Sequence, residues 1–474
     1  MKATDFHTTA RLPFDELGAV HFIGLGGAGM SAIARILLAR GVPVSGSDAR
    51  DSAVVRQLEA LGATVFVGHE AGHIGGADTV VVSTAIRPEN PELQAAVAAG
   101  LNIVHRSVAL SAAMEGKRLI AVGGTHGKTT TTAMATVMLQ AAGREPSFAI
   151  GGDVAALGVN AAHGEGDLFV AEADESDASF LNYRPQVIVV TNVEADHLDH
   201  YGSAEAVYAS FDQFTALLPA DGTLVVCLDD DGARALAERV AASGAPCRVL
   251  GYGYAADAQL RIVDSEFAGS GSTSRIEYPG GNCTLRLQVP GEHNIRNAAA
   301  ALAVALTQGI EPATAAEGLA GFTGAARRFE AKGAAAGVRV FDDYAHHPTE
   351  VHAALTAARK VAAGHAVHVL FQPHLFSRTR EFAAEFAQAL ELADSAAILD
   401  IYPAREDPIP GVTSELITNR LPSGSYAPDP ARAVADIVAR SEPGDIVLTV
   451  GAGDVTQYGP VLVKALEQAS TAVQ

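Results

Sequence analysis

The segment Gly123–Thr129 has the residue types and spacing of a phosphate-binding loop. It reads GGTHGKT and follows the apolar run Leu119–Val122. This is the short G-T-x-G-K-T form of a P-loop, because Val122 stands where the strict pattern has glycine. In such a loop the amides hold phosphates, the lysine reaches the β- and γ-oxygens, and the next hydroxyl can bind Mg²⁺. The segment predicts an ATP site in which Lys128 is exposed to the ligand and Thr129 faces the metal.

An earlier glycine-rich segment, Gly24–Gly29, predicts a second phosphate site. It reads GLGGAG between an apolar run and a helix-like stretch, and Asp48 follows about 20 residues later, as in the dinucleotide-binding fingerprint. Its glycines allow the backbone to approach a pyrophosphate at a helix N-terminus, which we prefer to a ligand-free turn. NAD and UDP-sugars both carry a pyrophosphate and a ribose. This diphosphate loop alone therefore leaves both ligands open.

Two acidic clusters follow predicted strands downstream of the P-loop. Glu172–Asp177 reads EADESD after Leu168–Ala171, and NVEADH, ending at His197, follows Val187–Thr191. Because ligands bind beyond the carboxyl ends of parallel strands, both clusters should lie beside the P-loop. Carboxylates at that edge would repel ATP unless a hard cation lay between them. The pattern predicts Mg²⁺, with His197 as a metal ligand rather than a helix-capping histidine.

An alternating strand–helix pattern starts three times along the chain, which predicts an α/β protein of three domains. We place them at residues 1–115 (a Rossmann-like parallel sheet), 116–325 (a P-loop ATPase-like domain) and 326–474 (a second Rossmann-like α/β domain). Three β-like runs within Gln259–Pro290 predict an antiparallel meander added to the central sheet. The strands predicted in the outer domains are Val20–Gly24, Pro43–Ser47, Thr64–Val67, Thr79–Ser83, Val338–Phe341, Val367–Phe371, Ala397–Ile401 and Ile446–Val450; the predicted helices include Ala28–Arg40, Ala53–Leu61 and Ala204–Leu218.

The amino-acid composition limits the kinds of molecule that this protein is expected to bind. The 474 residues include 33 basic and 54 acidic side chains, a formal net charge of −21. Such a charge, without a long Lys/Arg run, argues against nucleic-acid binding. The three cysteines lack C-x-x-C spacing, and the chain shows neither an apolar leader nor a membrane-length apolar stretch. We expect a soluble cytoplasmic protein, monomeric or homodimeric, without membrane insertion.

Ten motifs in order make the chain resemble the Mur ligase family, and within it the members that add L-alanine. They are HFIGLGGAGMSAIA, SGSD, GTHGKTTTT, AEADESD, TNVEADHLD, PGEHNIRNAAAA, RRF, FDDYAHHPTE, FQPHLFSRTR and VLTVGAGD. The resemblance implies an ATP-dependent ligase of peptidoglycan precursor synthesis. It would join the lactyl carboxylate of UDP-N-acetylmuramate to L-alanine through an acyl phosphate, with ATP and Mg²⁺ as substrate and cofactor.

The resemblance also implies residue roles. Lys128, Glu172, His197, Arg328 and Asp343 would be catalytic, with Thr129, Glu172 and His197 as the metal ligands and with Arg328 and Asp343 at the γ-phosphate. The ATP-binding residues would be Gly124, Thr125, His126, Gly127, Lys128, Thr129, Thr130, His293, Asn294 and Asn297. The UDP-sugar-binding residues would be Gly26, Gly27, Ala28, Gly29, Met30, Asp48 and Ser83. The amino-acid-binding residues would be Tyr344, His347, Arg378 and Arg380, the two arginines forming a fork for the alanine carboxylate.

Two positions depart from the family pattern. Many relatives have a carbamylated lysine that supports a second magnesium ion, and Asp212 stands at the corresponding position. Leu375-Phe376 stands where Arg-Tyr is expected.

Three alternative functions stay open at this point. A ligase of the same family could attach a preformed tripeptide, although the SRTR and GGAGM motifs favour L-alanine. The diphosphate loop could serve an NAD-linked oxidoreductase, for which a separate ATP site would be redundant. The P-loop could drive a nucleotide switch, marked by ATP turnover that a protein stimulates.

Overall fold

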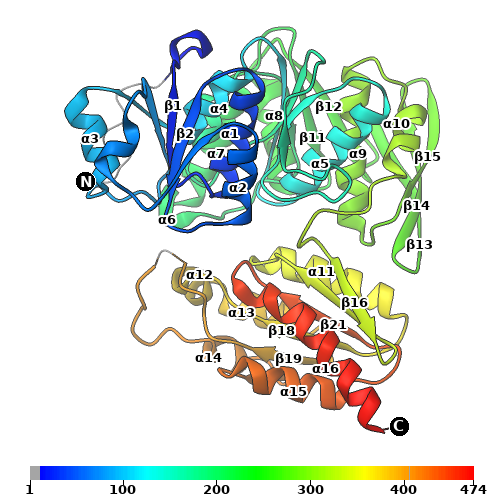
Figure 1. The fold of residues 1–474 in the computed structure, drawn as a ribbon. Helices are drawn as coiled ribbons and strands as arrows, with labels where there is room; N and C mark the ends of the chain where they lie inside the picture. The colour runs from blue at the N-terminus through cyan, green and yellow to red at the C-terminus, as the bar shows by residue number, and fades with distance from the viewer. Residues whose placement is uncertain (1–10, 405, 474) are drawn as a thin grey trace. The chain divides into compact units, whose positions relative to one another are not determined.

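The computed structural model describes residues 11–404 and 406–473, which form three separate β-sheets (Figure 1). The first sheet has five strands, the second ten and the third six. The first two sheets lie mainly in one compact unit that takes in most of the chain up to Ile262, and the third lies in a second unit. The predicted three-domain α/β fold is confirmed.

The first sheet is parallel, with the order β3-β2-β1-β4-β5. Its connections run outward on both sides of β1, so the loop after β1 lies at the point where the strand order reverses, the usual ligand position in such sheets. The strands are β1 (Val20–Ile23), β2 (Val44–Asp48), β3 (Thr64–Val67), β4 (Thr79–Val82) and β5 (Asn102–His105); the helices are α1 (Ala28–Ala39), α2 (Ala53–Ala60), α3 (Pro91–Ala99) and α4 (Arg106–Met114).

Helix α1 forms because its apolar residues recur at helical spacing. Met30, Ile33 and Leu37 are buried against the sheet. Its N-cap residue, Gly27, is extended and has no capping side chain, so the first amides of the helix are left for a ligand.

The central sheet places the P-loop between the two acidic clusters. Its order is β15-β14-β13-β12-β11-β10-β6-β9-β7-β8, so β6 (Arg118–Gly123), which precedes the P-loop, lies between β9 (Leu168–Glu172) and β10 (Pro185–Val190). Both neighbours run parallel to β6, so the segments that follow them emerge at the edge where the P-loop lies. The remaining elements of this region are β7 (Ser147–Ala149), β8 (Ala161–Ala162), β11 (Thr223–Cys227), β12 (Arg248–Gly253), α5 (Lys128–Ala141), α6 (Leu198–Tyr201), α7 (Ala204–Thr215), α8 (Asp231–Ala242), α9 (Glu292–Thr307) and α10 (Pro312–Leu319).

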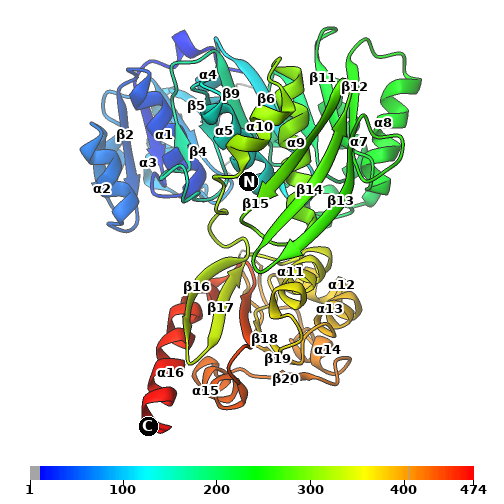
Figure 2. The same cartoon turned by 90° about the vertical axis from the view of Figure 1, so that its right-hand side faces the viewer.

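The predicted meander is confirmed at one end of this sheet. Strands β13 (Leu260–Ala268), β14 (Gly271–Tyr278) and β15 (Gly281–Leu287) are consecutive neighbours, shown side by side in Figure 2. Only two residues join each pair, and such short connections join antiparallel strands.

The third sheet has the order β16-β17-β21-β18-β19-β20. Four strands match the predicted ones closely: β17 (Val338–Asp343), β18 (Val367–Phe371), β19 (Ser395–Ile398) and β21 (Ile446–Val450). The prediction missed β16 (Glu330–Ala335), which pairs antiparallel with β17, and β20 (Gly424–Tyr426). The helices around this sheet are α11 (Pro348–Ala362), α12 (Phe376–Glu381), α13 (Ala383–Leu390), α14 (Glu415–Thr418), α15 (Pro430–Arg440) and α16 (Tyr458–Val473).

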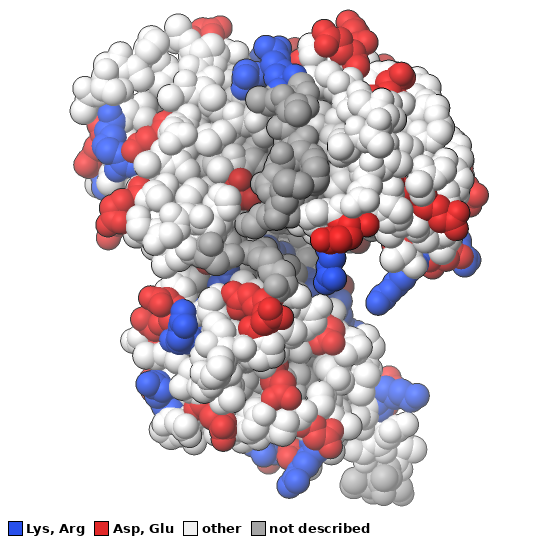
Figure 3. All heavy atoms as spheres, turned by 90° about the vertical axis from the view of Figure 1, so that its left-hand side faces the viewer, with Lys and Arg blue, Asp and Glu red and all other residues white. Residues whose placement is uncertain are grey.

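Surface properties agree with the composition. None of the helices that the structure describes combines the length and apolar character needed to cross a bilayer. On the face shown in Figure 3, Lys and Arg side chains occur in small separate groups, many of them beside Asp and Glu.

Candidate active site

The lysine of the P-loop lies in a cage of oxygens. Lys128 Nζ donates to the Gly124 and Thr125 carbonyls at 2.7 and 3.0 Å and lies 2.9 and 2.8 Å from the two carboxylate oxygens of Glu175. Its side chain is only 14% exposed and that of Glu175 only 2% exposed. Burial opposes the charge, but Glu175 outweighs burial and raises the pKa of Lys128. The expectation of an exposed lysine is therefore wrong, because a buried carboxylate holds it.

The predicted hydroxyl and carboxylate metal ligands are brought together. Thr129 Oγ1 donates to Glu172 Oε1 at 3.1 Å, and Glu172 Oε2 accepts from the Gly151 amide at 2.7 Å. Hydroxyl and carboxylate oxygens are the donors that Mg²⁺ prefers. The pair therefore fits the predicted cation.

His197 makes its contacts with other acids. Its Nε2 lies 3.5 Å from Glu175 Oε1 and 3.7 Å from Asp196 Oδ2. Its Nδ1 is buried and has no hydrogen-bond partner among the residues that the structure describes, so a donor atom is available. Burial opposes protonation, but the hydrogen bond to Glu175 outweighs it and raises the pKa of His197. The structure thus joins His197 to the lysine's partner instead of to Glu172.

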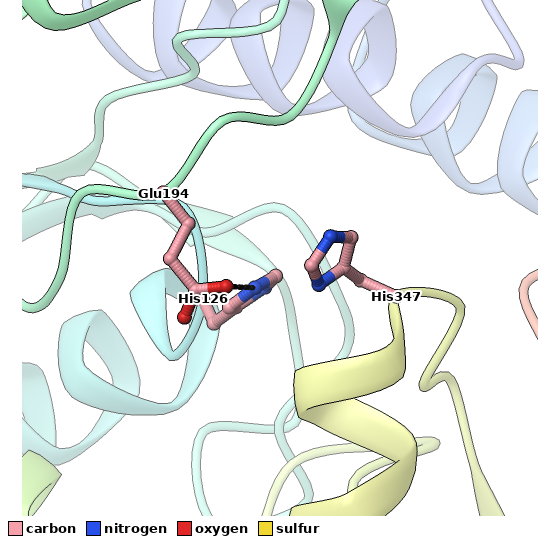
Figure 4. Close-up of side chains that lie close together, drawn as sticks. All are labelled: His126, Glu194 and His347. Atoms are coloured by element: carbon pink, nitrogen blue, oxygen red, sulfur yellow. Dashed lines mark ion pairs between the residues drawn. The ribbon is translucent and has the colours of Figure 1, made fainter. Parts of the chain in front are cut away.

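The segment after β10 clamps the P-loop backbone. The Asn192 side chain accepts from the His126 amide at 2.7 Å and donates to its carbonyl at 3.0 Å. Thr125 Oγ1 accepts from the Glu194 amide at 2.8 Å, and His126 Nε2 lies 3.6 Å from Glu194 Oε2, the ion pair drawn in Figure 4. Gly124 must be glycine, because its φ is +129° and a Cβ would lie 2.1 Å from Thr191 Oγ1. The clamp gives the P-loop a fixed shape before ATP binds.

The predicted adenine residues lie at the start of α9, and one of them reaches the P-loop. A Cβ on Gly127 would lie 2.7 Å from Asn297 Oδ1, so this amide packs directly against the loop. His293 lies one helical turn earlier on the same face. Burial, reinforced by the Arg296 charge, lowers the pKa of His293 to about 4, so its imidazole is neutral at pH 7. Asn294 is buried and donates to the Pro290 carbonyl, a structural bond within the helix start.

The diphosphate loop is shaped by Asp48. Its Oδ2 accepts from the Gly26 amide at 2.9 Å, and a Cβ on Gly26 would lie at the same distance from that oxygen. The neighbouring Ser47 hydroxyl donates to the buried Glu92 carboxylate, which fixes the end of β2. Asp48 therefore braces the loop from within. Of the other predicted residues, Gly27 is the N-cap of α1 and Ala28 is its first residue. Met30 is buried on the side of α1 that faces the core, and Ser83 directly follows β4.

In the third domain, a tight turn presents Arg328. Arg327 and Phe329 have φ values of +58° and +50°, a left-handed conformation that costs non-glycine residues energy. Asp343, at the end of β17, holds the turn by accepting from the Phe329 amide at 2.8 Å and the Ala345 amide at 2.8 Å. Arg328 Nη1 lies 3.5 Å from Glu350 Oε1. Asp343 thus acts in this structure as the brace of the Arg328 turn.

The pH dependence of unfolding should report this buried carboxylate. Burial outweighs Arg328 and raises the pKa of Asp343 from 3.8 to about 6, so ionisation destabilises the fold as pH rises through that interval. Two pKa units correspond to about 3 kcal/mol. We expect the unfolding free energy of the parent to fall by about 3 kcal/mol relative to Asp343→Asn between pH 3 and pH 7 in denaturant titrations. Loss of one amide bond in the variant is independent of pH, so parallel curves would contradict the assignment.

The predicted amino-acid-binding arginines face different surroundings. Arg378, on α12, is 6% exposed, and its Nη1 lies 3.5 Å from His374 Nδ1. Arg380 is exposed, because residues two apart on a helix point to different sides. The structure does not bring the two arginines together as one fork.

Other predicted residues of this region lie at the ends of its elements. His347 is buried at the N-terminus of α11, and its ring packs edge-on against Phe382 with centroids 4.9 Å apart. The guanidinium carbon of Arg327 lies over the Tyr344 ring, 4.7 Å from the ring centroid. His374, which the sequence analysis did not select, stacks on Tyr402 at 5.8 Å beside Arg378.

The two departures from the family pattern are structurally distinct. Asp212 is half-exposed on α7, and its carboxylate accepts from Arg239 Nε at 2.9 Å. This ion pair gives Asp212 a structural partner away from Thr129 and Glu172. Leu375 is buried with a φ of +71° and starts the helix that carries Arg378.

Comparisons with known proteins cover nearly the whole chain. Three family models match in succession: "Mur ligase family, catalytic domain" over residues 19–118, "Mur ligase middle domain" over 122–305, and "Mur ligase, glutamate ligase domain" over 327–453. The chain is 62% identical over 459 residues to UDP-N-acetylmuramate–L-alanine ligase of Paenarthrobacter aurescens (strain TC1), covering 97% of this chain and 99% of the relative.

Two solved structures share the fold. UDP-N-acetylmuramate-alanine ligase MurC from Thermotoga maritima has a TM-score of 0.77 and 27% identity, covering 96% of this chain and all of that one. A murein peptide ligase from Psychrobacter arcticus 273-4 has a TM-score of 0.69 and 26% identity, covering 95% and 99%. Together with a P-loop flanked by two acidic clusters, these matches confirm the resemblance, and the chain belongs to the Mur ligase family.

Proposed function

We propose that this chain is an ATP-dependent ligase that joins the lactyl carboxylate of UDP-N-acetylmuramate to the amine of L-alanine in peptidoglycan precursor synthesis. The observation that carries the proposal is the pairing of Lys128 with Glu175 and of Thr129 with Glu172 at one P-loop, in a unit that also contains the diphosphate loop. A relative that is 62% identical over nearly its full length has this activity in its name.

The chemistry requires activation because a carboxylate is a poor acyl donor. A lactyl oxygen attacks the γ-phosphorus, the bond to ADP breaks, and an acyl phosphate forms. The neutral amine of L-alanine then attacks the acyl carbon, a proton leaves the nitrogen, and phosphate departs. One ATP is thus converted to ADP and phosphate for each amide formed.

The residues around the P-loop supply the electrostatics of the first step. Lys128 offsets the charge that accumulates as the carboxylate approaches the phosphate, and the amides of Gly127, Lys128 and Thr129, where α5 begins, hold the β- and γ-oxygens. Thr129 and Glu172 would hold Mg²⁺, which neutralises phosphate charge when bound, whereas His197 lies beside Glu175 and Asp196. The diphosphate loop binds the UDP moiety, and Arg378 in the third domain binds the alanine carboxylate. A cytoplasmic location fits these substrates.

A phosphate-release assay tests the proposal. The protein is given ATP, Mg²⁺ and UDP-N-acetylmuramate, and phosphate is measured with L-alanine, with the tripeptide L-alanyl-γ-D-glutamyl-meso-diaminopimelate, and with no amine. We expect release that depends on both the sugar nucleotide and L-alanine. Release with the tripeptide alone would make it a tripeptide ligase, and stimulation by a protein partner without an amine would make it a switch.

A binding measurement tests the oxidoreductase alternative. Calorimetric titration should show UDP-N-acetylmuramate binding without detectable NAD or NADP binding. Micromolar NAD binding that the sugar nucleotide displaces would contradict the proposal.

A further inference from the structure

Arg106 lies where the diphosphate loop meets the acidic cluster that follows β9. It is the first residue of α4 and comes directly after β5, at the carboxyl edge of the first sheet. A Cβ placed on Gly29 would lie 2.9 Å from Arg106 Nη1, so the guanidinium lies directly against the start of α1. Arg106 lies outside both glycine-rich loops and both acidic clusters in the sequence.

The other side of the guanidinium is held by two carboxylates. Arg106 Nη2 donates to Asp174 Oδ2 at 3.2 Å and lies 3.9 Å from Asp177 Oδ2. Asp174 is itself fixed, because its Oδ1 accepts from the Ser176 amide at 3.0 Å.

One nitrogen of the Arg106 guanidinium faces the diphosphate loop. Among the residues that the structure describes, the hydrogen bond of the Arg106 side chain goes to Asp174 through Nη2, and Nη1 is the nitrogen beside Gly29. The side chain is 30% exposed, so a ligand can reach it. The loop from Gly24 to Met30 contains no Lys or Arg of its own.

A pyrophosphate at this loop needs more positive charge than the helix supplies. Helix α1 offers backbone amides and about half a unit charge, whereas a pyrophosphate diester carries two negative charges. Four carboxylates between Glu172 and Asp177 make the surroundings more negative still. A guanidinium binds phosphate oxygens through charge-assisted hydrogen bonds that are about twice as strong as neutral ones.

We propose that Arg106 binds the pyrophosphate of the sugar nucleotide through Nη1, with Asp174 as the positioning residue that holds the guanidinium against Gly29. The inference rests on the proposed function, since it takes a UDP-sugar as the ligand of this loop. It adds a side-chain ligand supplied by α4 to a site that the sequence assigned to backbone amides. Arg106 would then contact both the pyrophosphate and Asp174, which belongs to the acidic cluster beside the P-loop.

Binding of UDP and uridine to the full chain separates this role from a structural one. Uridine lacks the pyrophosphate but keeps the base and ribose. We expect Arg106→Gln to weaken UDP binding roughly 10- to 150-fold, the range for one lost charge-assisted hydrogen bond. The affinity of the variant for uridine should stay within about twofold of that of the parent. Arg106→Lys should restore part of the UDP affinity, because an ammonium keeps the charge without the fork. Asp174→Asn should give a smaller loss with the same preference for UDP over uridine.

The controls keep the possible failures apart. Arg56→Ala removes an exposed arginine of the same domain that pairs with Asp51, and it should change neither affinity. Equal losses for UDP and uridine in Arg106→Gln, or no loss for either, would overturn the inference. A loss for UDP-N-acetylmuramate but none for UDP would overturn it too, because Arg106 would then contact the muramoyl carboxylate. If the parent chain itself fails to bind UDP-N-acetylmuramate, the proposed function fails instead.

Discussion

Replacing Lys128 with alanine should lower turnover at least ~100-fold, the scale expected for removing one preorganised charge stabiliser from a transition state. The reason is its position: Nζ lies among the Gly124 and Thr125 carbonyls at the centre of the P-loop. Steady-state phosphate release at saturating substrates measures the loss. Activity within a few-fold of the parent would refute the P-loop assignment.

The structure changes how this experiment must be controlled. Because Lys128 is paired with Glu175, alanine alone leaves a buried carboxylate with His197 at 3.5 Å as its remaining positive neighbour, which costs up to about 3–5 kcal/mol of stability. The double variant Lys128→Ala/Glu175→Gln removes both charges and should regain most of the lost thermal stability without regaining activity. Recovery of activity in the double variant would show that the single variant had failed through misfolding. Lys128→Arg keeps the charge and reports how strictly the cage fits an ammonium.

The framework of the site follows from local sequence patterns. Glycine spacing after an apolar run defines both phosphate loops, and the P-loop and diphosphate loop lie where those patterns place them, after β6 and β1. The rule that ligands lie at the carboxyl ends of parallel strands placed both acidic clusters beside the P-loop, and β9 and β10 do flank β6. These features need only short segments and their order, so one sequence is enough to predict them.

The individual contacts between these segments depend on the tertiary path of the loops. Nothing in the string EADESD indicates that Glu175 contacts Lys128 while Glu172 contacts Thr129, because the chain turns after β9 and sends these side chains in different directions. The Asn192 clamp is likewise invisible from spacing, since it joins segments 66 residues apart. Arg106 follows an ordinary strand, and only its distance from Gly29 gives it a role.

Some secondary structure was missed for a related reason. Strand β16 reads EAKGAA, and glycine, alanine, lysine and glutamate are all depleted in strands. It forms because β17 offers it a partner at the edge of the sheet. Such a strand is defined by its neighbour more than by its own side chains.

The amino-acid site gives the second large effect. Arg378 is buried beside His374, and a guanidinium binds a carboxylate through two parallel hydrogen bonds. Arg378→Ala should therefore raise the KM for L-alanine roughly 10- to 150-fold, because a charge-assisted hydrogen bond contributes about 1.5–3 kcal/mol. The KM values for ATP and UDP-N-acetylmuramate should barely change, since the P-loop and the diphosphate loop lie in other domains. Initial rates with each substrate varied in turn measure all three constants.

Neighbouring arginines make the prediction specific to this side chain. Arg378→Lys should recover only part of the affinity, because an ammonium lacks the planar two-pronged geometry. Arg380→Ala should have a much smaller effect than Arg378→Ala, since Arg380 is exposed on another side of α12. Arg432, 82% exposed on α15, offers a matched control whose replacement should leave every KM unchanged. An unchanged alanine KM with a large rise for ATP or the sugar nucleotide would instead make Arg378 a phosphate ligand. The carboxylate of L-alanine would then have to be bound by residues other than this buried arginine.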